Sequence, residues 1–174
     1  MIIANYMVEH TDLDQVWMVV SPQNPLKKKA SLARDRDRLH MVRLAIGDNH
    51  NLKASDVEFN MPIPSYTIDT LAVLKEKYNS YSFVLLMGGD SLPTLPKWKN
   101  YEKLIQENEI YVFKRPGYDL GPLADHENVT ILKDSPVLQI SASFVRKCIK
   151  EDKSIKYLVP DVVFDYIDGS SMYK

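Results

Sequence analysis

Residues 83–91 read Phe83-Val84-Leu85-Leu86-Met87-Gly88-Gly89-Asp90-Ser91. The first five form a continuous apolar run, which is typical of a strand buried on both faces of a parallel sheet. The two glycines that follow let the backbone come close to a ligand, and an aspartate can accept hydrogen bonds from ribose hydroxyls. An ordinary strand-ending turn, with Asp90 capping the next helix, explains the same residues equally well.

Segments typical of strands and of helices alternate along the rest of the chain. Apolar runs rich in β-branched and aromatic residues predict strands at residues 15–20, 57–59, 82–87, 109–113 and 129–132. Apolar residues at helical spacing predict helices at residues 1–11, 34–46, 67–78, 101–108, 143–150 and 161–167. This alternation predicts an α/β fold of the Rossmann-like class, with a mostly parallel sheet and helices on both faces. Ligands of such sheets bind at the carboxyl ends of the strands.

Length and charge limit the class of protein. The chain has 174 residues, which suits one domain, and we expect residues 1–174 to form it. Its formal net charge is -1, which argues against a general affinity for nucleic acid or for an anionic membrane. No apolar run reaches the roughly 18 to 20 residues that span a bilayer, so we expect no membrane segment. Assembly into a homo-oligomer is left open.

The cysteine and histidine content argues against two further kinds of site. Cys148 is the only cysteine, which excludes an internal disulfide framework and fits a reducing compartment, so we expect the cytoplasm. The 4 histidines are scattered, with no thiolate or carboxylate at metal-ligand spacing. No dedicated transition-metal site is therefore predicted.

Two segments place hydroxyl groups at the start of a predicted helix. Residues 140–146 read Ile140-Ser141-Ala142-Ser143-Phe144-Val145-Arg146. Free amides at such a helix start attract phosphate, and Arg146, one turn in, could reach triphosphate oxygens. Residues 64–67 read Pro64-Ser65-Tyr66-Thr67, where amides and hydroxyls could hold a carboxylate or the hydroxyls of a second substrate. For both segments the alternative is an ordinary Ser/Thr N-cap.

Three further features follow predicted strands. Trp98 is a flat indole that could stack on a base or a pyridine ring, although such a side chain more often packs in a core. Lys27 belongs to the basic run Asn24-Pro25-Leu26-Lys27-Lys28-Lys29, which either contacts phosphate or is simply solvated. Arg115 opens the rigid turn Arg115-Pro116-Gly117-Tyr118 and faces either ligand or solvent. None of these features decides a function alone, but their order along the chain does.

Taken in order, the segments resemble those of bacterial nicotinate mononucleotide adenylyltransferases. The resemblance runs from about residue 1 to residue 168, and it includes the six motifs at residues 21–27, 64–71, 88–98, 115–118, 140–146 and 157–160. Pro64-Ser65-Tyr66-Thr67 combined with Trp98 separates this family from its pantetheine-phosphate relatives. The resemblance therefore predicts a member of the nucleotidyltransferase superfamily of α/β phosphodiesterases.

The resemblance implies a reaction in NAD biosynthesis. ATP and nicotinate mononucleotide would give deamido-NAD and pyrophosphate, by direct attack of the mononucleotide phosphate without an enzyme-bound intermediate. Mg²⁺ would accompany the nucleotide, held mainly by the substrate phosphates. An adenylyltransferase acting on another phosphate substrate and a catalytically impaired nucleotide-binding remnant are the alternatives.

The resemblance also implies roles for individual residues. The positions that correspond to the ATP side are Gly88, Asp90, Ile140, Ser143 and Arg146. Those that correspond to the mononucleotide side are Ser65, Tyr66, Thr67, Trp98 and Arg115, with Trp98 stacked on the pyridine and amides near Thr67 receiving its carboxylate. Lys27 and Arg146 lie where the family places cations near the reacting phosphates.

The beginning of the chain departs from the family pattern. The family opens with a central strand and a Gly-x-Phe-x-Pro-x-His-x-Gly-His loop, whose histidines contact ATP phosphates. Here Met1 directly precedes the helix that follows this loop in the family. We expect either a natural start roughly 20 residues upstream, as the ~30-residue size of a βαβ unit suggests, or a shortened chain with poor activity.

Overall fold

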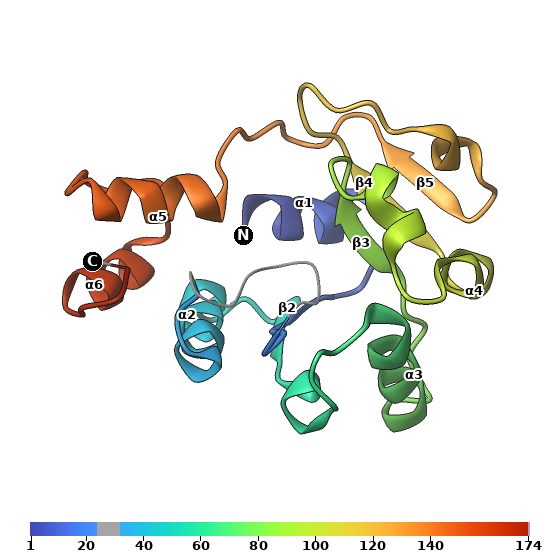
Figure 1. The fold of residues 1–174 in the computed structure, drawn as a ribbon, viewed down its shortest axis with the longest axis horizontal. Helices are drawn as coiled ribbons and strands as arrows, with labels where there is room; N and C mark the ends of the chain where they lie inside the picture. Colours follow the sequence, from blue (N-terminus) through green and yellow to red (C-terminus); the bar gives the residue numbers. More distant parts are fainter. Residues whose placement is uncertain (24–31, 174) are drawn as a thin grey trace. The chain divides into compact units, whose positions relative to one another are not determined.

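The structure is a computed structural model that describes residues 1–23 and 32–173. These residues form two compact units, one of Met1–Ile63 with Ile140–Lys174 and the other of Pro64–Gln139 (Figure 1). Each unit has its own parallel strands and its own helices. The predicted α/β class with parallel pairing is therefore confirmed, whereas the prediction that residues 1–174 form a single domain stays a prediction.

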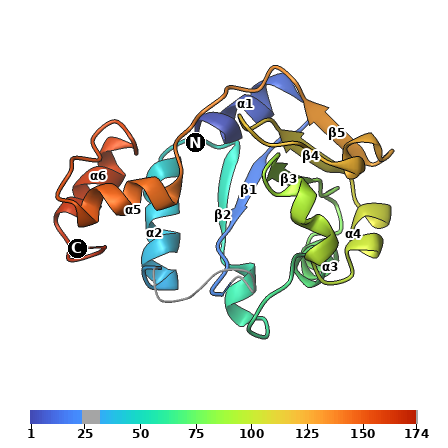
Figure 2. The ribbon, with the colours of Figure 1, turned by 45° about the horizontal axis from the view of Figure 1, so that its top comes forward.

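The unit of Met1–Ile63 and Ile140–Lys174 contains a pair of parallel strands. Strand β1 (Val16–Val19) pairs with β2 (Leu52–Ser55), with Val16 opposite Leu52 and Val19 opposite Ser55 (Figure 2). Helix α1 (Ile2–His10) packs beside β1, and α2 (Asp35–Ile46) packs beside β2. The two short strands are thus held between helices, and both strands end on the same side.

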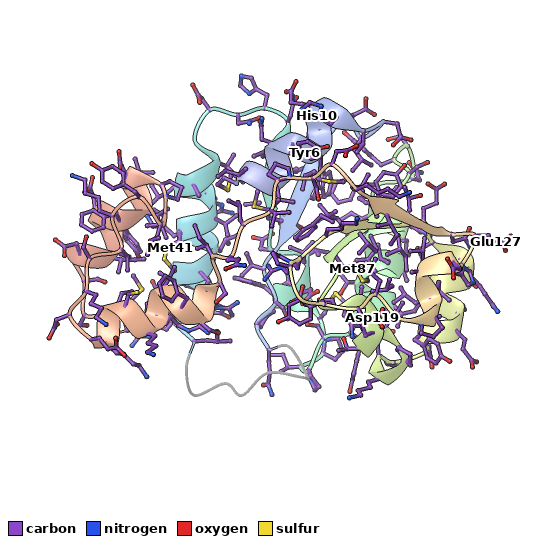
Figure 3. All side chains as sticks on the ribbon, turned by 90° about the horizontal axis from the view of Figure 1, so that it is seen from above. Tyr6, His10, Met41, Met87, Asp119 and Glu127 are labelled. Carbon is purple, nitrogen blue, oxygen red and sulfur yellow. The ribbon has the colours of Figure 1, made fainter. Side chains whose placement is uncertain are left out.

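The same unit carries a separate helical cluster. Helices α5 (Ala142–Lys150) and α6 (Asp161–Asp168) bury apolar side chains against each other. The buried members are Val145, Cys148, Ile149, Ile155, Val163 and Ile167. Met41 of α2 packs against this cluster (Figure 3), so α2 links the strand pair to the two carboxyl-terminal helices.

The unit of Pro64–Gln139 is built on a three-stranded parallel sheet. Its strands are β3 (Leu85–Gly88), β4 (Ile110–Phe113) and β5 (Val129–Leu132), in the order β3-β4-β5. Its helices are α3 (Thr67–Lys77) and α4 (Tyr101–Glu107), with 3₁₀ turns η3 (Leu92–Lys97) and η4 (Pro122–Asp125). The buried cluster of this unit consists of Leu71, Met87, Leu92, Leu95, Leu104, Ile105, Ile110 and Val112. Burial of this apolar surface is the main force that holds sheet and helices together.

One predicted strand is wrong. Residues 57–59 form part of the 3₁₀ helix η2 (Val57–Asn60), and the strand lies just before it at Leu52–Ser55. Phe59 donates its backbone N–H to the carbonyl of Asp56 at 2.9 Å, which closes a helical turn immediately after β2. Glu58 lies buried in that turn. Val57 and Phe59 are partly buried, and the alternation of apolar residues here belongs to a 3₁₀ turn instead of a strand.

Candidate active site

The carboxyl ends of β3 and β4 meet at one edge of the sheet. Gly88 and Phe113 are register partners at the ends of these strands, and Gly89 donates its N–H to the carbonyl of Phe113 at 2.8 Å. The chain continues from Gly88 into Asp90, and from Phe113 into Arg115. Parallel pairing therefore brings two predicted site segments, one from each strand, to the same place.

Asp90 and Arg115 contact each other at this edge. Arg115 Nε lies 3.2 Å from Asp90 Oδ1, and each side chain is 33% exposed. The geometry is that of an ion pair without a hydrogen bond, because Nε has no hydrogen-bond partner in the described part of the chain. The guanidinium carbon also lies 5.8 Å from the centroid of the Phe113 ring. The alternative in which Asp90 caps the next helix does not hold, since Ser91 occupies the N-cap position of η3.

The two glycines of the turn lie close to neighbouring side chains. A Cβ on Gly88 would lie 2.5 Å from Asp90 Oδ1, 3.1 Å from Arg115 Nε and 3.2 Å from Cζ of Phe113. A Cβ on Gly89 would lie 2.8 Å from a methyl carbon of Leu120. A side chain on Gly88 would therefore displace the Asp90–Arg115 pair, whereas one on Gly89 would require the end of the Leu120 side chain to move.

The start of α3 presents the second group of predicted residues. Tyr66 occupies the N-cap position and Thr67 is the first residue of the helix, while Ser65 before them is buried. Within the described residues, the Tyr66 side chain accepts no hydrogen bond from the first helical turn. An ordinary Ser/Thr N-cap is therefore not what begins this helix. The amide of Thr67 lies at the positive end of the helix dipole, which favours a negatively charged ligand.

Trp98 follows η3 and is partly buried. Its backbone N–H is donated to the carbonyl of Leu95 at 2.9 Å, and its indole packs against the buried cluster of the unit. Ile68 of α3 packs against the same cluster. The indole Nε1 is buried and has no hydrogen-bond partner among the residues described. Trp98 therefore contributes to packing, as one interpretation of the sequence predicted, and its remaining exposed surface is available for a stacking role.

The third group of predicted residues lies on α5, in the unit of Met1–Ile63 and Ile140–Lys174. Ser141 is the N-cap, and its Oγ accepts a hydrogen bond from the backbone N–H of Phe144 at 3.1 Å. Ser143 is exposed, and its Oγ accepts a hydrogen bond from Nη2 of Arg146 at 3.1 Å. Ile140, which precedes the cap, is 38% exposed. The ordinary capping interpretation is thus correct for Ser141, and Ser143 and Arg146 remain accessible.

Three further points concern Lys27, metal ions and membrane-spanning helices. Lys27, predicted near the phosphates, lies outside the described residues. Residues 1–23 and 32–173 contain no group of three or more His, Cys, Asp or Glu side chains that could hold a metal ion. None of the helices in that part of the chain is long and apolar enough to cross a membrane.

Known proteins resemble this chain over nearly its whole length. The family model described as cytidylyltransferase-like matches residues 1–148. The Flavobacterium psychrophilum protein named "Probable nicotinate-nucleotide adenylyltransferase" is 50% identical over 100% of this chain and 91% of its own length. Proteins of the same name from Cytophaga hutchinsonii and Bacillus licheniformis are 46% and 31% identical, and each match covers 90% of the relative. The chain belongs to the nicotinate-nucleotide adenylyltransferases.

Solved structures agree with the fold of this adenylyltransferase. Plasmodium falciparum nicotinic acid mononucleotide adenylyltransferase complexed with NaAD matches with a TM-score of 0.80. The match covers 98% of this chain and 88% of that chain, at 20% sequence identity. The complex of the Plasmodium enzyme with APC gives a TM-score of 0.73 at 18% identity. At these identities the likeness supports the fold and not the individual site residues.

The structure adds one candidate, Lys99, that the sequence analysis did not select. Lys99 Nζ lies 2.8 Å from Asp69 Oδ2 and 4.7 Å from the centroid of the Tyr66 ring. Both contacts reach the first turn of α3, beside Thr67. Lys99 directly follows Trp98 in the sequence, which was the available signal, but a single lysine in a loop is most often only solvated.

Proposed function

We propose that the chain transfers the adenylyl group of ATP to nicotinate mononucleotide, which yields deamido-NAD and pyrophosphate. Family membership, with 50% identity over 91% of the length of a relative of that name, is the observation that carries the proposal. The grouping of Gly88, Asp90 and Arg115 at one strand edge adds to it, because ligands of parallel sheets bind there.

The proposed step is a single displacement at phosphorus. A phosphate oxygen of the mononucleotide attacks the α-phosphorus of ATP, the new P–O bond forms, and the bond from the α-phosphorus to the bridging oxygen of pyrophosphate breaks. The electron pair of that bond leaves with pyrophosphate. No residue of the chain needs to form a covalent bond, so the work of the protein is alignment of the two substrates and neutralisation of charge.

We assign the mononucleotide to the start of α3 and to Trp98. The amides near Thr67 would receive the nicotinate carboxylate, because they lie at the positive end of an 11-residue helix. The indole of Trp98 would stack on the pyridine ring. Ser65 and Tyr66 immediately precede this turn, and we assign them to the same pocket.

On the basis of the sequence motifs, we assign a role in binding ATP to the Gly88 turn of one unit and, separately, to the start of α5 of the other. Asp90 would accept hydrogen bonds from ribose hydroxyls through Oδ2, since Oδ1 faces Arg115. Gly88 would let the backbone approach the nucleotide, and Arg115 would border the mononucleotide while it holds Asp90 in place. On α5, Ile140 and Ser143 would border ATP, and Arg146 would face the triphosphate.

Two further cations complete the proposed charge balance. Lys27 is assigned to the reacting phosphates with Arg146, on the basis of its position in the sequence alone. Mg²⁺ would enter as the complex with ATP and would be held mainly by phosphate oxygens, where it neutralises the charge of the leaving pyrophosphate. Removal of Mg²⁺ with a chelator should therefore abolish turnover.

The proposed partners are ATP and nicotinate mononucleotide, and the proposed compartment is the cytoplasm. The second assignment rests on Cys148, which is the only cysteine and is free and buried, as suits a reducing compartment. Neither nucleic acid nor membrane is a proposed partner, because the net charge is -1. A homo-oligomer is compatible with these assignments, and light scattering on the purified chain measures it.

The direct test supplies the chain with ATP, Mg²⁺ and one of two mononucleotides. Formation of dinucleotide is followed by chromatography, and release of pyrophosphate is followed by a coupled assay. We expect both products with nicotinate mononucleotide, and much slower formation with nicotinamide mononucleotide. Turnover of the amide alone would contradict the proposed specificity, and binding of both substrates without pyrophosphate release would favour a nucleotide-binding remnant.

A further inference from the structure

Lys99 connects the loop that carries Trp98 to the first turn of α3. Its Nζ lies 2.8 Å from Oδ2 of Asp69 and 4.7 Å from the centroid of the Tyr66 ring. Tyr66 is the N-cap of α3, and Asp69 is its third residue. One ammonium group therefore contacts the helix on both sides of Thr67.

Asp69 places a negative charge in the turn of α3 at which the proposed pocket would bind the negatively charged nicotinate carboxylate. The nicotinate carboxylate, bound at the amides near Thr67, would share the first helical turn with the Asp69 carboxylate. Two carboxylates a few ångströms apart repel each other, and the repulsion disfavours binding of the second. Nicotinamide mononucleotide carries a neutral amide at the same position and would not be repelled. An unpaired Asp69 would therefore select against the acid and in favour of the amide.

We propose that Lys99 is a positioning residue that neutralises Asp69 and thereby sets the preference for the acid mononucleotide over the amide. The inference rests on the proposed function, because it assumes that the pyridine substrate binds at the start of α3. It adds a determinant of specificity outside the group of residues that would touch the substrate.

The ion pair between Lys99 and Asp69 contributes little to the stability of the fold. The side chains of Lys99 and Asp69 are 43% and 45% exposed, and exposed pairs of this kind contribute little to stability. Removing the charge of Lys99 should therefore leave the chain folded. Lys99 Nζ lies over the Tyr66 ring, and replacement of Lys99 by arginine should keep a cation there, because the guanidinium has the same charge and is also attracted to an aromatic face.

The test measures the dissociation constants of both mononucleotides by calorimetry, for the full chain and for four variants. We expect Lys99→Met to weaken binding of the acid about tenfold, as a like charge within one helical turn would. Affinity for the amide should stay within about twofold, the scale of a neutral surface change. The double variant Lys99→Met/Asp69→Asn should regain most of the lost affinity for the acid, and Lys99→Arg should resemble the unchanged chain.

Lys103→Met is the matched control. It removes a lysine of the same unit that forms an exposed ion pair with Glu107 at 3.7 Å on α4, away from the first turn of α3. We expect it to change neither dissociation constant. Tm is recorded for each variant, so that any loss of folding is seen directly.

The outcomes separate this inference from the function on which it rests. Equal weakening of acid and amide in Lys99→Met would make Lys99 merely structural and overturn the inference. Failure of the double variant to recover would assign Lys99 a direct contact with the substrate carboxylate, and would also overturn it. Binding of neither mononucleotide by the unchanged chain would refute the proposed function. An acid preference that persists undiminished in Lys99→Met would refute the inference alone.

Discussion

The candidate residues of the two compact units differ in how the fold holds them. In the unit of Pro64–Gln139, Asp90 pairs with Arg115 and Trp98 packs against the buried cluster. On α5 of the other unit, Ser143 is exposed, and within the described residues the side chain of Arg146 donates a hydrogen bond only to Ser143. A charged or aromatic group that is fixed before the substrate arrives loses less entropy on binding. The candidate groups in the unit of Pro64–Gln139 are thus held in place before a ligand binds, whereas those on α5 would become ordered on binding.

The largest effect is expected from Gly88→Ala. The new methyl group would lie 2.5 Å from Asp90 Oδ1 and 3.1 Å from Arg115 Nε, so both side chains must move. Displacement of positioning groups by about 1 Å can cost about 100-fold in rate, and we expect a loss of that order in kcat/KM. Steady-state kinetics measure it.

Gly169→Ala is the control for this substitution. The added methyl group would meet only the carbonyl of Asp165, at 3.4 Å, which is an ordinary contact. Its kinetics should be unchanged. Full activity in Gly88→Ala would show that the prearranged pair is dispensable, and the contrast between the two units would lose its functional meaning.

Arg146→Ala should weaken the binding of ATP and leave the stability of the chain nearly unchanged. A charge-assisted hydrogen bond contributes roughly 1.5–3 kcal/mol, so we expect KM for ATP to rise about 10- to 100-fold. Tm should hardly change, since within the described residues Arg146 donates a side-chain hydrogen bond only to Ser143. Kinetics at varied ATP and a thermal melt provide the two measurements.

Lys147→Ala is the neighbouring control on α5. Lys147 forms an exposed ion pair with Glu151 at 3.7 Å and has no assigned role toward substrate. It should leave KM for ATP unchanged. If Arg146→Ala destabilised the folded chain, in free energy, by as much as it weakened the binding of ATP, Arg146 would instead be part of the framework, as the residues of the other unit are.

Much of this fold was predictable because local patterns and packing agree. The runs that became β3 and β4 are apolar, β4 also carries the β-branched residues Ile110 and Val112, and the two strands pair in a parallel sheet. Strand β2 was missed because Leu52-Lys53-Ala54-Ser55 has few residues that favour strands. Its backbone is extended because it pairs with β1, and this pairing is a tertiary effect that no local window contains.

The sequence suggested candidate residues for the site, but it could not give their contacts. Glycines after a buried strand and a tryptophan after a proline turn are visible in the sequence. The ion pair between Asp90 and Arg115 is not, because it depends on the register of β3 against β4. The Lys99–Asp69 pair joins residues 30 positions apart and likewise required the folded chain.

Trp98→Ala should weaken binding of nicotinate mononucleotide by about 1–3 kcal/mol, the scale of aromatic stacking on a base. Loss of the indole also loosens packing against the buried cluster, so Tm should fall as well. Calorimetric titration with the mononucleotide and a thermal melt measure the two effects. A loss of affinity and a fall in Tm are expected together only in the unit of Pro64–Gln139, because its candidate residues also belong to the core.

Tyr101→Ala separates stacking from packing. Tyr101 is also partly buried and packs against the same cluster, but it has no assigned contact with substrate. We expect a fall in Tm without a comparable loss of affinity. Equal losses of affinity in the two variants would assign the effect of Trp98 to loosened packing and place its indole outside the pocket.

The smallest effect is expected at the carboxyl end of α5, where charges stabilise the helix away from its candidate residues. Lys153 Nζ lies 2.7 Å from Glu151 Oε2, and this hydrogen bond lowers the pKa of Glu151 below its ordinary 4.5. The same bond raises the pKa of Lys153 above 10.5. The stabilisation is therefore fully present above pH 4.5 and is lost as the pH falls through the folded pKa of Glu151.

Lys153→Met tests this assignment by thermal melts across the acid range. Its Tm should lie slightly below that of the unchanged chain at neutral pH, and the two values should converge as the pH falls through the folded pKa of Glu151, which lies below 4.5. KM for ATP should not change, because the pair lies more than one helical turn beyond Arg146. A Tm difference that persists undiminished at about pH 2 would mean that Lys153 stabilises the chain through packing of its stem and not through charge. A change in KM for ATP would mean that the exposed start of α5 depends on its far end, so that α5 would also be a prearranged part of the site.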